Sequence, residues 1–248
     1  MNVAHAAFAF APGLALGSFL NVVAARLPRG VSIVHPRSAC ASCATPIALY
    51  DNIPLLSYAL IRGRCRACGG RIPVRYPLVE LATGLLVAAC VLVFGLTPRA
   101  GVAALLCAAL VAVTATDLEH RIVPNRIVVP AAAAVLLGQT LIEPSPEWLL
   151  AAVGAALFLL LAALAYPGGM GMGDVKLALL LGAGLGHSVA AALMVAMLTA
   201  LLPAAALLVR HGGSARKMAI PFAPFLALGG VVALFAGESL INLYLGLF

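Results

Sequence analysis

Charged residues are scarce in this sequence, and their scarcity excludes most classes of soluble protein. Only 9% of the 248 residues are charged, whereas 64% are hydrophobic. A water-exposed globular protein carries about 25% charged residues, so this chain lacks the material for a solvated surface. Apolar stretches of about 20 residues recur along it, each long enough to cross a hydrocarbon core of about 30 Å. We therefore predict an all-α polytopic membrane protein.

Three further absences narrow the class. No basic stretch precedes the apolar segment 6–25, which predicts an uncleaved first span in place of a secretory signal peptide. The sequence has no glycine-rich dinucleotide fingerprint, so a nucleotide site of the Rossmann type is not predicted. It also shows no internal repeat with paired broken helices, a feature typical of transporters. A proton-relaying transporter is therefore the weaker hypothesis.

The net charge of +7 comes from basic residues whose positions predict how the chain is oriented in the membrane. Hydropathy predicts about eight spans, at 6–25, 78–96, 100–116, 127–142, 148–166, 175–187, 188–209 and 220–246. If the N-terminus lies outside, fourteen of the fifteen basic residues lie inside, and eight of them are arginines of the loop from Arg26 to Arg75. The positive-inside rule thus predicts that both termini lie outside, and it explains the basic residues without nucleic-acid binding.

The sixth segment, 175–187, is short and rich in glycine, and two interpretations are open. It either crosses the membrane or forms a re-entrant segment that lines a cavity. If it failed to cross, the basic cluster of Arg210, Arg216 and Lys217 would move outside. A crossing is therefore favoured.

Four cysteines, Cys40, Cys43, Cys65 and Cys68, form two CxxC pairs separated by 21 residues. Two such knuckles close a tetrahedral four-thiolate site, the usual structural arrangement for zinc. The predicted topology places this loop in the cytosol, where thiols stay reduced. The alternative is a pair of redox dithiols or disulfides. Four thiolates leave no position for water, so the predicted zinc is structural and folds a loop with little core of its own.

Two aspartates lie at span ends, where charge is costly and marks functional candidates. Asp117 ends the third span and Asp174 opens the sixth, so the predicted topology places both at the cytoplasmic face. Paired carboxylates share one proton, which lets one activate water while the other polarises a scissile carbonyl. Gly171 and Gly173 lack side chains and would let an extended substrate approach. Lys176 either extends to the interface or neutralises substrate charge.

The acidic residues also have purely structural interpretations. Asp174 is a favoured residue for the N-cap of its helix. Asp117 lies one turn before Arg121, a suitable partner for an ion pair. Glu80 either pairs with Arg75 or reaches a polar site near the start of the second span. Single motifs do not decide between these interpretations.

Longer motifs make the sequence similar to a known family. They are Gly17-Ser18-Phe19-Leu20-Asn21, Tyr50-Asp51-Asn52 between the knuckles, Arg75-Tyr76-Pro77, and the two aspartate motifs around Asp117 and Gly171-Met172-Gly173-Asp174. Together they resemble the bacterial type IV prepilin peptidases, also called leader peptidase/N-methyltransferases, over nearly the whole chain. One departure is Ala223, where the family pattern has glycine.

The resemblance implies that Asp117 and Asp174 are the catalytic pair of a multi-pass protein of the bacterial inner membrane. It implies cleavage of a prepilin or pseudopilin after a glycine, between a short basic leader and a hydrophobic helix, at the cytoplasmic face. Such substrates belong to type IV pilus, type II secretion and competence systems. The new N-terminal amine would then be methylated by S-adenosylmethionine, and Glu80 is a candidate contributor to substrate or cofactor binding.

The implied organisation has three parts. Residues 1–26 form the first span, 27–77 the zinc loop associated with methyl transfer, and 78–248 the peptidase domain. Intramembrane proteases of the presenilin or signal-peptide-peptidase type also use a GxGD motif. They cut within the bilayer and have no cytosolic zinc loop between early spans, so the four cysteines favour the prepilin peptidase interpretation.

Overall fold

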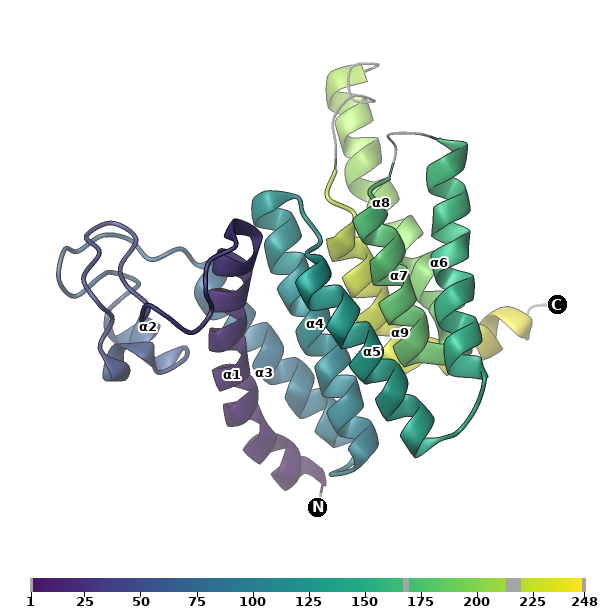
Figure 1. The fold of residues 1–248 in the computed structure, drawn as a ribbon, viewed down its shortest axis with the longest axis horizontal. Helices are drawn as coiled ribbons and strands as arrows, with labels where there is room; N and C mark the ends of the chain where they lie inside the picture. The colour runs from purple at the N-terminus through teal and green to yellow at the C-terminus, as the bar shows by residue number, and fades with distance from the viewer. Residues whose placement is uncertain (1, 167–169, 213–219, 247–248) are drawn as a thin grey trace. The chain divides into compact units, whose positions relative to one another are not determined.

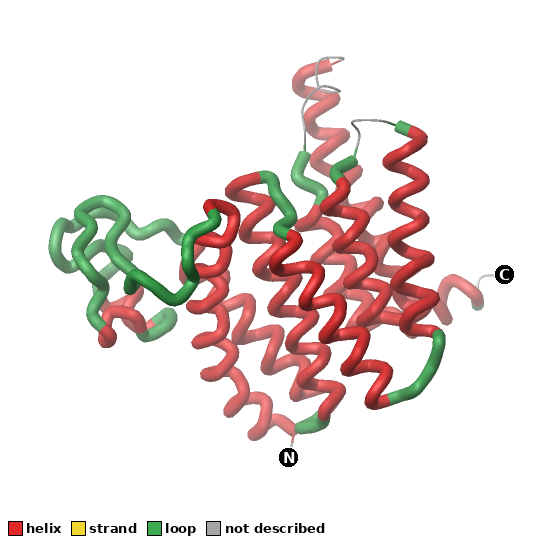
Figure 2. Tube along the Cα trace, in the orientation of Figure 1, coloured by secondary structure: helices red, strands yellow, loops and turns green. Residues whose placement is uncertain are grey.

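A computed structural model describes residues 2–166, 170–212 and 220–246 of the chain (Figure 1). In these ranges the regular secondary structure is helical, apart from two isolated β-bridges (Figure 2). The long helices are α1 (Asn2–Arg26), α3 (Arg75–Phe94), α4 (Pro98–His120), α5 (Asn125–Ile142), α6 (Glu147–Ala165), α7 (Met172–Leu185), α8 (Val189–His211) and α9 (Ala223–Leu245). The connections hold α2 (Leu56–Leu60) and the 3-10 helices η1 (Leu27–Arg29), η2 (Leu49–Asn52) and η3 (Gly186–Ser188).

The helices confirm the predicted multi-pass, all-α class. Seven runs in the described residues are long and apolar enough to cross a membrane. One of them, Met172–His211, covers 40 residues and contains both α7 and α8. The eight predicted spans therefore correspond to eight long helices. Arg216 and Lys217, on which the predicted orientation partly depends, lie outside the described residues, and the orientation itself stays a prediction.

Glycines stop three of these helices. Gly95, Gly186 and Gly212 follow α3, α7 and α8 with φ angles of 71°, 57° and 57°. A left-handed backbone suits glycine, which has no Cβ, and it ends the helical ladder. The turn at Gly186 is tight enough for α8 to begin at Val189, directly after η3.

The first compact unit, residues 1–115, is built on the contact between α1 and α3. Gly17 makes this approach possible, because a Cβ there would lie 2.6 Å from the Cα of Glu80. The Asn21 side-chain amide donates a hydrogen bond to the Tyr76 carbonyl oxygen at 3.0 Å. These contacts hold together the two helix ends from which the loop 27–74 extends.

The second unit, residues 116–248, is organised around α7. Leu177, Leu180 and Leu181 of this helix are fully buried, and α5, α6 and α9 pack against it (Figure 1). At Gly182 the backbone of Ala151 in α6 occupies the space that a Cβ would need. The close packing fixes the position of α7, which carries one of the two predicted catalytic residues.

α7 is short for a membrane span. Its 14 residues give a length of about 21 Å, against a hydrocarbon core of about 30 Å. The backbone N–H of His187, just after α7, donates to Glu147 Oε1 at 2.9 Å, and His187 Nδ1 lies 2.7 Å from the same oxygen. Because Glu147 begins α6, α7 returns to the level at which α6 starts. This arrangement favours the crossing interpretation over a re-entrant segment.

Candidate active site and metal centre

Asp117 lies in the last turn of α4, and its side chain is buried. Its carboxylate accepts a hydrogen bond from the backbone N–H of Ala223, the first residue of α9. The N–H groups of a first helical turn have no partner within the helix and carry a partial positive charge, so they suit a carboxylate. Oδ2 of Asp117 is buried and has no hydrogen-bond partner among the described residues.

Asp174 is the third residue of α7, and its N-cap is Gly171. The structure therefore does not place Asp174 at the N-cap itself. Its carboxylate instead accepts a hydrogen bond from the backbone of Gly171, as an acidic residue at the third helical position does in a capping box. Asp174 also lies close enough to Asp117 for the two carboxylates to interact electrostatically. The second unit thus brings both predicted catalytic residues together.

The connection from α4 to α5 holds this arrangement in place. Arg121 has a positive φ of 54°, and its backbone N–H donates to the Asp117 carbonyl oxygen at 2.8 Å. Two residues later, Val123 packs on α7. At the start of α5, the Asn125 Oδ1 atom accepts a hydrogen bond from Lys176 Nζ at 2.8 Å. The connection therefore contacts α7 on both sides of Asp174.

The two glycines before Asp174 have different surroundings. A Cβ on Gly173 would lie 2.6 Å from the Cβ of Val123, so the missing side chain is a requirement of packing. A Cβ on Gly171 would meet only Asp174 Oδ2 at 3.6 Å and one backbone nitrogen at 3.9 Å, which are ordinary contact distances. Among the described residues, Gly171 therefore has room beside it that Gly173 lacks.

Sequence reasoning missed two groups at this site. The first is the Ala223 N–H, which meets Asp117 through tertiary packing that no local pattern signals. The second is His120, three residues after Asp117: its place near the polar interface predicts a solvated side chain, but its Nε2 atom is buried without a hydrogen-bond partner in the described ranges. The carboxylate atom Glu119 Oε2 lies 3.7 Å from it, too far for a hydrogen bond. Its spacing from Asp117 was the only available signal.

The first unit brings the four cysteines together. The sulfur atoms of Cys40, Cys43, Cys65 and Cys68 all lie within 4.8 Å of one another. In a tetrahedral zinc site with Zn–S bonds of about 2.3 Å, neighbouring sulfurs are about 3.8 Å apart. The Cys40 and Cys68 sulfurs are 3.8 Å apart. The cluster could therefore hold a metal ion, and its donor set and spacing fit zinc.

Each CxxC pair forms the same backbone knuckle. In the first, the Cys40 N–H donates to Thr45 O and the Ala44 N–H donates to Cys40 O, both at 2.9 Å. Ala44 has a positive φ of 57°. The second knuckle repeats these bonds at 2.8 Å, with φ 70° at its glycine, in residues Cys65, Gly69 and Gly70. Two matching turns thus present four sulfurs to one point.

Charges around the knuckles support this arrangement. The backbone N–H groups of Cys43 and Ser42 lower the pKa of Cys40 to about 6, which favours the thiolate that a metal requires. Arg66, inside the second knuckle, binds both carboxylate oxygens of Asp51, with the shortest contact at 2.7 Å. The hydrogen bonds from Arg66 lower the pKa of Asp51. This ion pair ties the second knuckle to η2.

Glu80 belongs to the first unit and is buried in the second turn of α3, near the N-terminal end at which the loop enters the helix. Its Oε2 atom accepts the backbone N–H of Leu55 at 2.9 Å. Leu55 has a positive φ of 59°, which is unusual for a residue with a side chain. Glu80 thus holds the turn that precedes α2.

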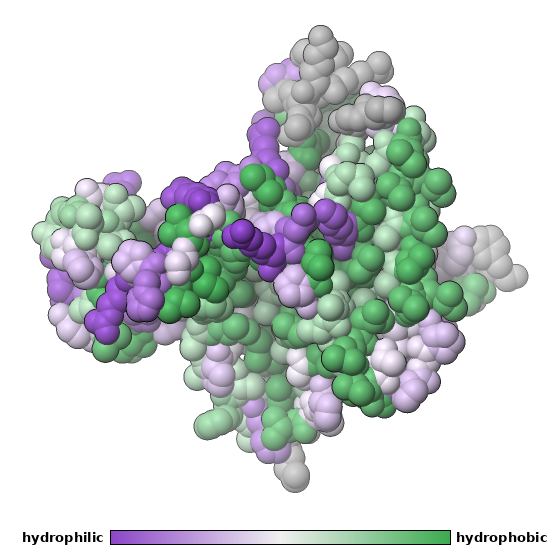
Figure 3. Space-filling view, in the orientation of Figure 1, coloured by the Kyte–Doolittle hydropathy of each residue, from purple (hydrophilic) through white to green (hydrophobic). Residues whose placement is uncertain are grey.

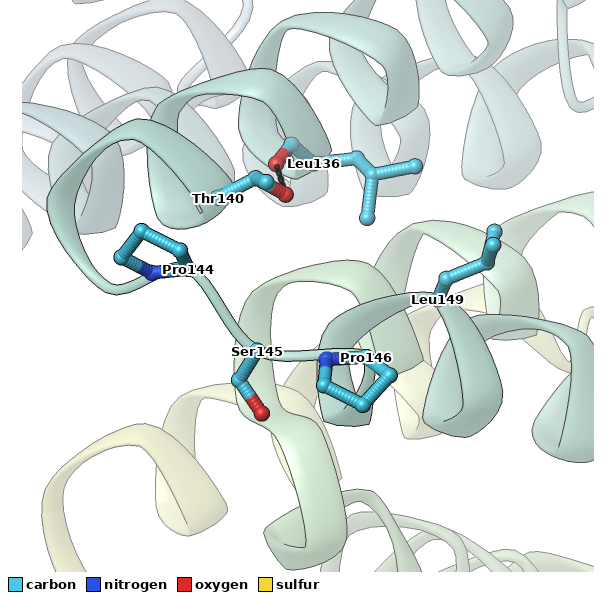
Figure 4. Close-up of a pocket in the computed structure, with 6 residues that line it drawn as sticks. All are labelled: Leu136, Thr140, Pro144, Ser145, Pro146 and Leu149. Carbon is cyan, nitrogen blue, oxygen red and sulfur yellow. Dashed lines mark hydrogen bonds between the residues drawn. The ribbon is translucent and has the colours of Figure 1, made fainter.

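A shallow cavity of about 380 Å³ lies at the opposite end of the second unit, where α5 turns into α6 (Figure 4). Its lining residues carry no acid, base or nucleophile stronger than a hydroxyl, and the Thr140 hydroxyl already donates to Leu136 O at 2.8 Å. We therefore assign no chemistry to this cavity. The candidate active site is formed by packed side chains around Asp117 and Asp174.

The fold and the four-cysteine loop define a polytopic helical membrane protein with a small module whose cysteine cluster could hold a metal ion. Residues 12–94 match the Bacterial Peptidase A24 N-terminal domain, and residues 104–209 match the Type IV leader peptidase family. The prepilin leader peptidase/N-methyltransferase of Bacillus subtilis (strain 168) is 37% identical over 241 residues, which cover 94% of this chain and 95% of that protein. This chain belongs to the type IV leader peptidase family, and it is a multi-pass protein of the inner membrane.

Other relatives carry the same name. The protein of Myxococcus xanthus (strain DK1622) is 52% identical over 129 residues, which cover 52% of this chain and 38% of that protein. The protein of Pseudomonas aeruginosa is 34% identical over 265 residues, covering 94% of this chain and 91% of that protein. No solved structure shows significant similarity to the chain.

Proposed function

We propose that this protein cleaves the leader peptide of a prepilin or pseudopilin and then methylates the new N-terminal amine. The names of its relatives support both steps. The observation that best supports peptide hydrolysis is that Asp174 lies close enough to Asp117 for the two carboxylates to interact electrostatically. Each carboxylate also accepts a backbone hydrogen bond at a helix N-terminus.

The two aspartates act as one unit in this mechanism. Two neighbouring carboxylates in a medium of low dielectric cannot both ionise easily, so the pair holds one proton. The ionised member takes a proton from water, the water oxygen attacks the scissile carbonyl carbon, and the protonated member hydrogen-bonds the carbonyl oxygen. When the C–N bond breaks, the pair returns a proton to the leaving amine. The partnerless Oδ2 of Asp117 is suited to binding that water.

The substrate backbone is proposed to lie along the N-terminal end of α7. The open space beside Gly171 supports this placement. Gly173 contributes by allowing the close contact with Val123, and its backbone can still face the substrate. Lys176 is bound to Asn125, which supports a role in holding the first turn of α7 beside α5. In this proposal Lys176 would also neutralise negative charge on the substrate.

The active site is proposed to open to the cytoplasm, with both termini outside. The distribution of basic residues supports this orientation. If the end of α7 near Glu147 lies at the outer interface, the short helix leaves Asp174 about 10 Å below the cytoplasmic surface of the hydrocarbon core. The leader junction of a prepilin, which precedes a membrane-embedded hydrophobic helix, would lie close to this depth. The three-part organisation into 1–26, 27–77 and 78–248 remains part of the proposal.

Zinc is the proposed metal of the loop, bound by Cys40, Cys43, Cys65 and Cys68. Four thiolates leave no coordination position for water, so the ion would contribute folding energy and no chemistry of cleavage. S-adenosylmethionine is the proposed methyl donor, since it would supply an electrophilic methyl group to the amine. Glu80 supports methyl transfer indirectly, because it positions the Leu55 turn of the same loop.

The decisive experiment uses the purified full chain in detergent, a prepilin-type substrate and labelled S-adenosylmethionine. We expect the wild type to release the leader and label the new N-terminus. Asp174→Asn should lose cleavage, yet it should still methylate a pilin supplied already cut, because the loop is intact. A wild type that neither cuts nor methylates several pilin-like substrates would refute the proposed function.

A further inference from the structure

A groove of about 210 Å³ lies in the first unit, between the last two turns of α1 and the loop that follows it. Its lining combines two arginines, Arg26 and Arg37, with apolar residues that include Phe19, Val22, Val34 and Leu49. The mechanism of cleavage uses none of these residues. The lining is thus amphipathic, with guanidinium groups next to an apolar wall.

The groove extends from membrane depth to the level of the headgroups. Phe19 lies seven positions before Arg26 on α1, which places it about 10 Å deeper along the helix axis. Phe19 is 47% exposed, and α1 is one of the apolar runs long enough to span a membrane, so this ring is accessible to an acyl chain. Arg26 ends α1 at the position where a span leaves the hydrocarbon. A single bound molecule could therefore contact the lipid face at one end and a guanidinium at the other.

The charge of the groove selects an anion. The guanidinium of Arg26 donates from one nitrogen to Ser32 O at 3.0 Å, and an arginine has five N–H donors in all. Arg37 is exposed, and no carboxylate belongs to the lining in the part of the chain that the structure describes. The acidic residue of the surrounding loop, Asp51, is already bound to Arg66. Two guanidiniums without a counter-charge favour a phosphate.

Exposed apolar side chains continue this surface onto the loop. Val34 is 68% exposed and Leu49 is 77% exposed, although both lie outside the spans. The space-filling view shows hydrophilic and apolar residues side by side over this loop (Figure 3). Basic residues interleaved with exposed apolar ones are typical of a segment that rests on an anionic membrane surface.

We propose that this groove binds one anionic phospholipid. The phosphate contacts Arg26 and Arg37, and an acyl chain follows Phe19 and Val22 along α1. The inference does not depend on peptidase or methyltransferase activity; only the choice of leaflet, the cytoplasmic one, rests on the proposed orientation. S-adenosylmethionine is a poor occupant, because its own carboxylate only balances its ammonium, and the remaining sulfonium charge would approach two guanidiniums in a lining without an acidic residue.

Native mass spectrometry of the full chain, released from detergent with phosphatidylglycerol or phosphatidylcholine, tests this proposal. We expect one phosphatidylglycerol to be retained in preference to phosphatidylcholine. Arg26→Gln and Arg37→Gln should each weaken that binding about fivefold. Arg71→Gln removes the same charge from an exposed position of the same loop outside the groove, so its binding should stay within twofold of the wild type. An equal loss in Arg71→Gln would overturn the specific site.

A second measurement covers the case in which the glutamine variants fold poorly. Phe19→Trp in a Trp148→Phe background places the single tryptophan of the chain in the groove. Phosphatidylglycerol brominated on its acyl chain should quench this tryptophan more strongly than brominated phosphatidylcholine, with no arginine changed. Equal quenching would contradict the proposal. Relief of quenching by soluble glycerol phosphate would identify a free-phosphate site, and relief by S-adenosylmethionine a methyl-donor site; either result would overturn the lipid assignment.

Discussion

Gly173→Ala tests how the connection between α4 and α5 positions the catalytic pair. The added Cβ would lie 2.6 Å from the Cβ of Val123, whereas two carbons in contact prefer about 3.5–4.0 Å. One of the two segments must therefore move by about 1 Å, and α7 is held by packing along its length. Overpacking of this kind costs about 1–3 kcal/mol. The displaced segment carries Asp174 or contacts Asp117, and a misplacement of about 1 Å costs about 100-fold in rate.

The assay is kcat/KM for a prepilin-type peptide. We expect Gly173→Ala to lower it about 100-fold and the double variant Gly173→Ala/Val123→Gly to recover a large part of the loss, because the Cβ that the added carbon would meet at 2.6 Å is removed. Gly171→Ala is the matched control for packing, since its Cβ would meet nothing closer than 3.6 Å. Gly171→Ala should leave thermal stability unchanged, whatever its effect on substrate binding. Full activity in Gly173→Ala, or no recovery in a folded double variant, would refute this reasoning.

Three further predictions concern the loop. Cys65→Ser should reduce bound zinc to near zero by plasma mass spectrometry and increase proteolysis of the loop, whereas retention of one zinc per chain would contradict the four-thiolate site. In metal-free protein, the backbone hydrogen bonds lower the pKa of Cys40 from 9.0 to about 6, so its thiol is ionised at pH 7. The rate of Cys40 alkylation should therefore fall as the pH drops through about 6. An alkylation rate that rises only toward pH 9 would contradict the role of these hydrogen bonds. Glu80→Ala removes the acceptor of the Leu55 N–H and should loosen the turn by about 1–3 kcal/mol, seen as faster proteolysis there; Glu80→Gln keeps an acceptor oxygen and should stay close to the wild type.

Much of the fold was predictable because membrane helices are encoded locally. Apolar length alone gave the eight long helices, and the repeated CxxC spacing anticipated a sulfur cluster that the structure assembles within 4.8 Å. The sequence also identified Asp117 and Asp174 as residues at helix ends. These predictions needed only hydropathy, spacing and the cost of charge in an apolar medium.

The remaining features depend on tertiary packing. The N–H that binds Asp117 comes from Ala223, whose sequence signal was only a departure from an expected glycine. The two glycines of the GxGD motif look equivalent in sequence, yet only Gly173 has Val123 packed against it. From its sequence position, Glu80 could have paired with Arg75 or reached a polar site. Its observed contact is with the Leu55 N–H, and it requires a loop conformation in which Leu55 has a positive φ. Such contacts join distant segments, so local patterns do not encode them.

The central claim is that Asp117 and Asp174 form one catalytic unit. The most direct test measures kcat/KM for leader cleavage in the wild type, Asp117→Asn, Asp174→Asn and the double variant, with helicity checked in each. Residues that act as a unit give strongly non-additive losses. We therefore predict that each single variant loses nearly all cleavage and that the double variant loses no more. A single variant that retains substantial cleavage, or losses that multiply in the double variant, would contradict the claim.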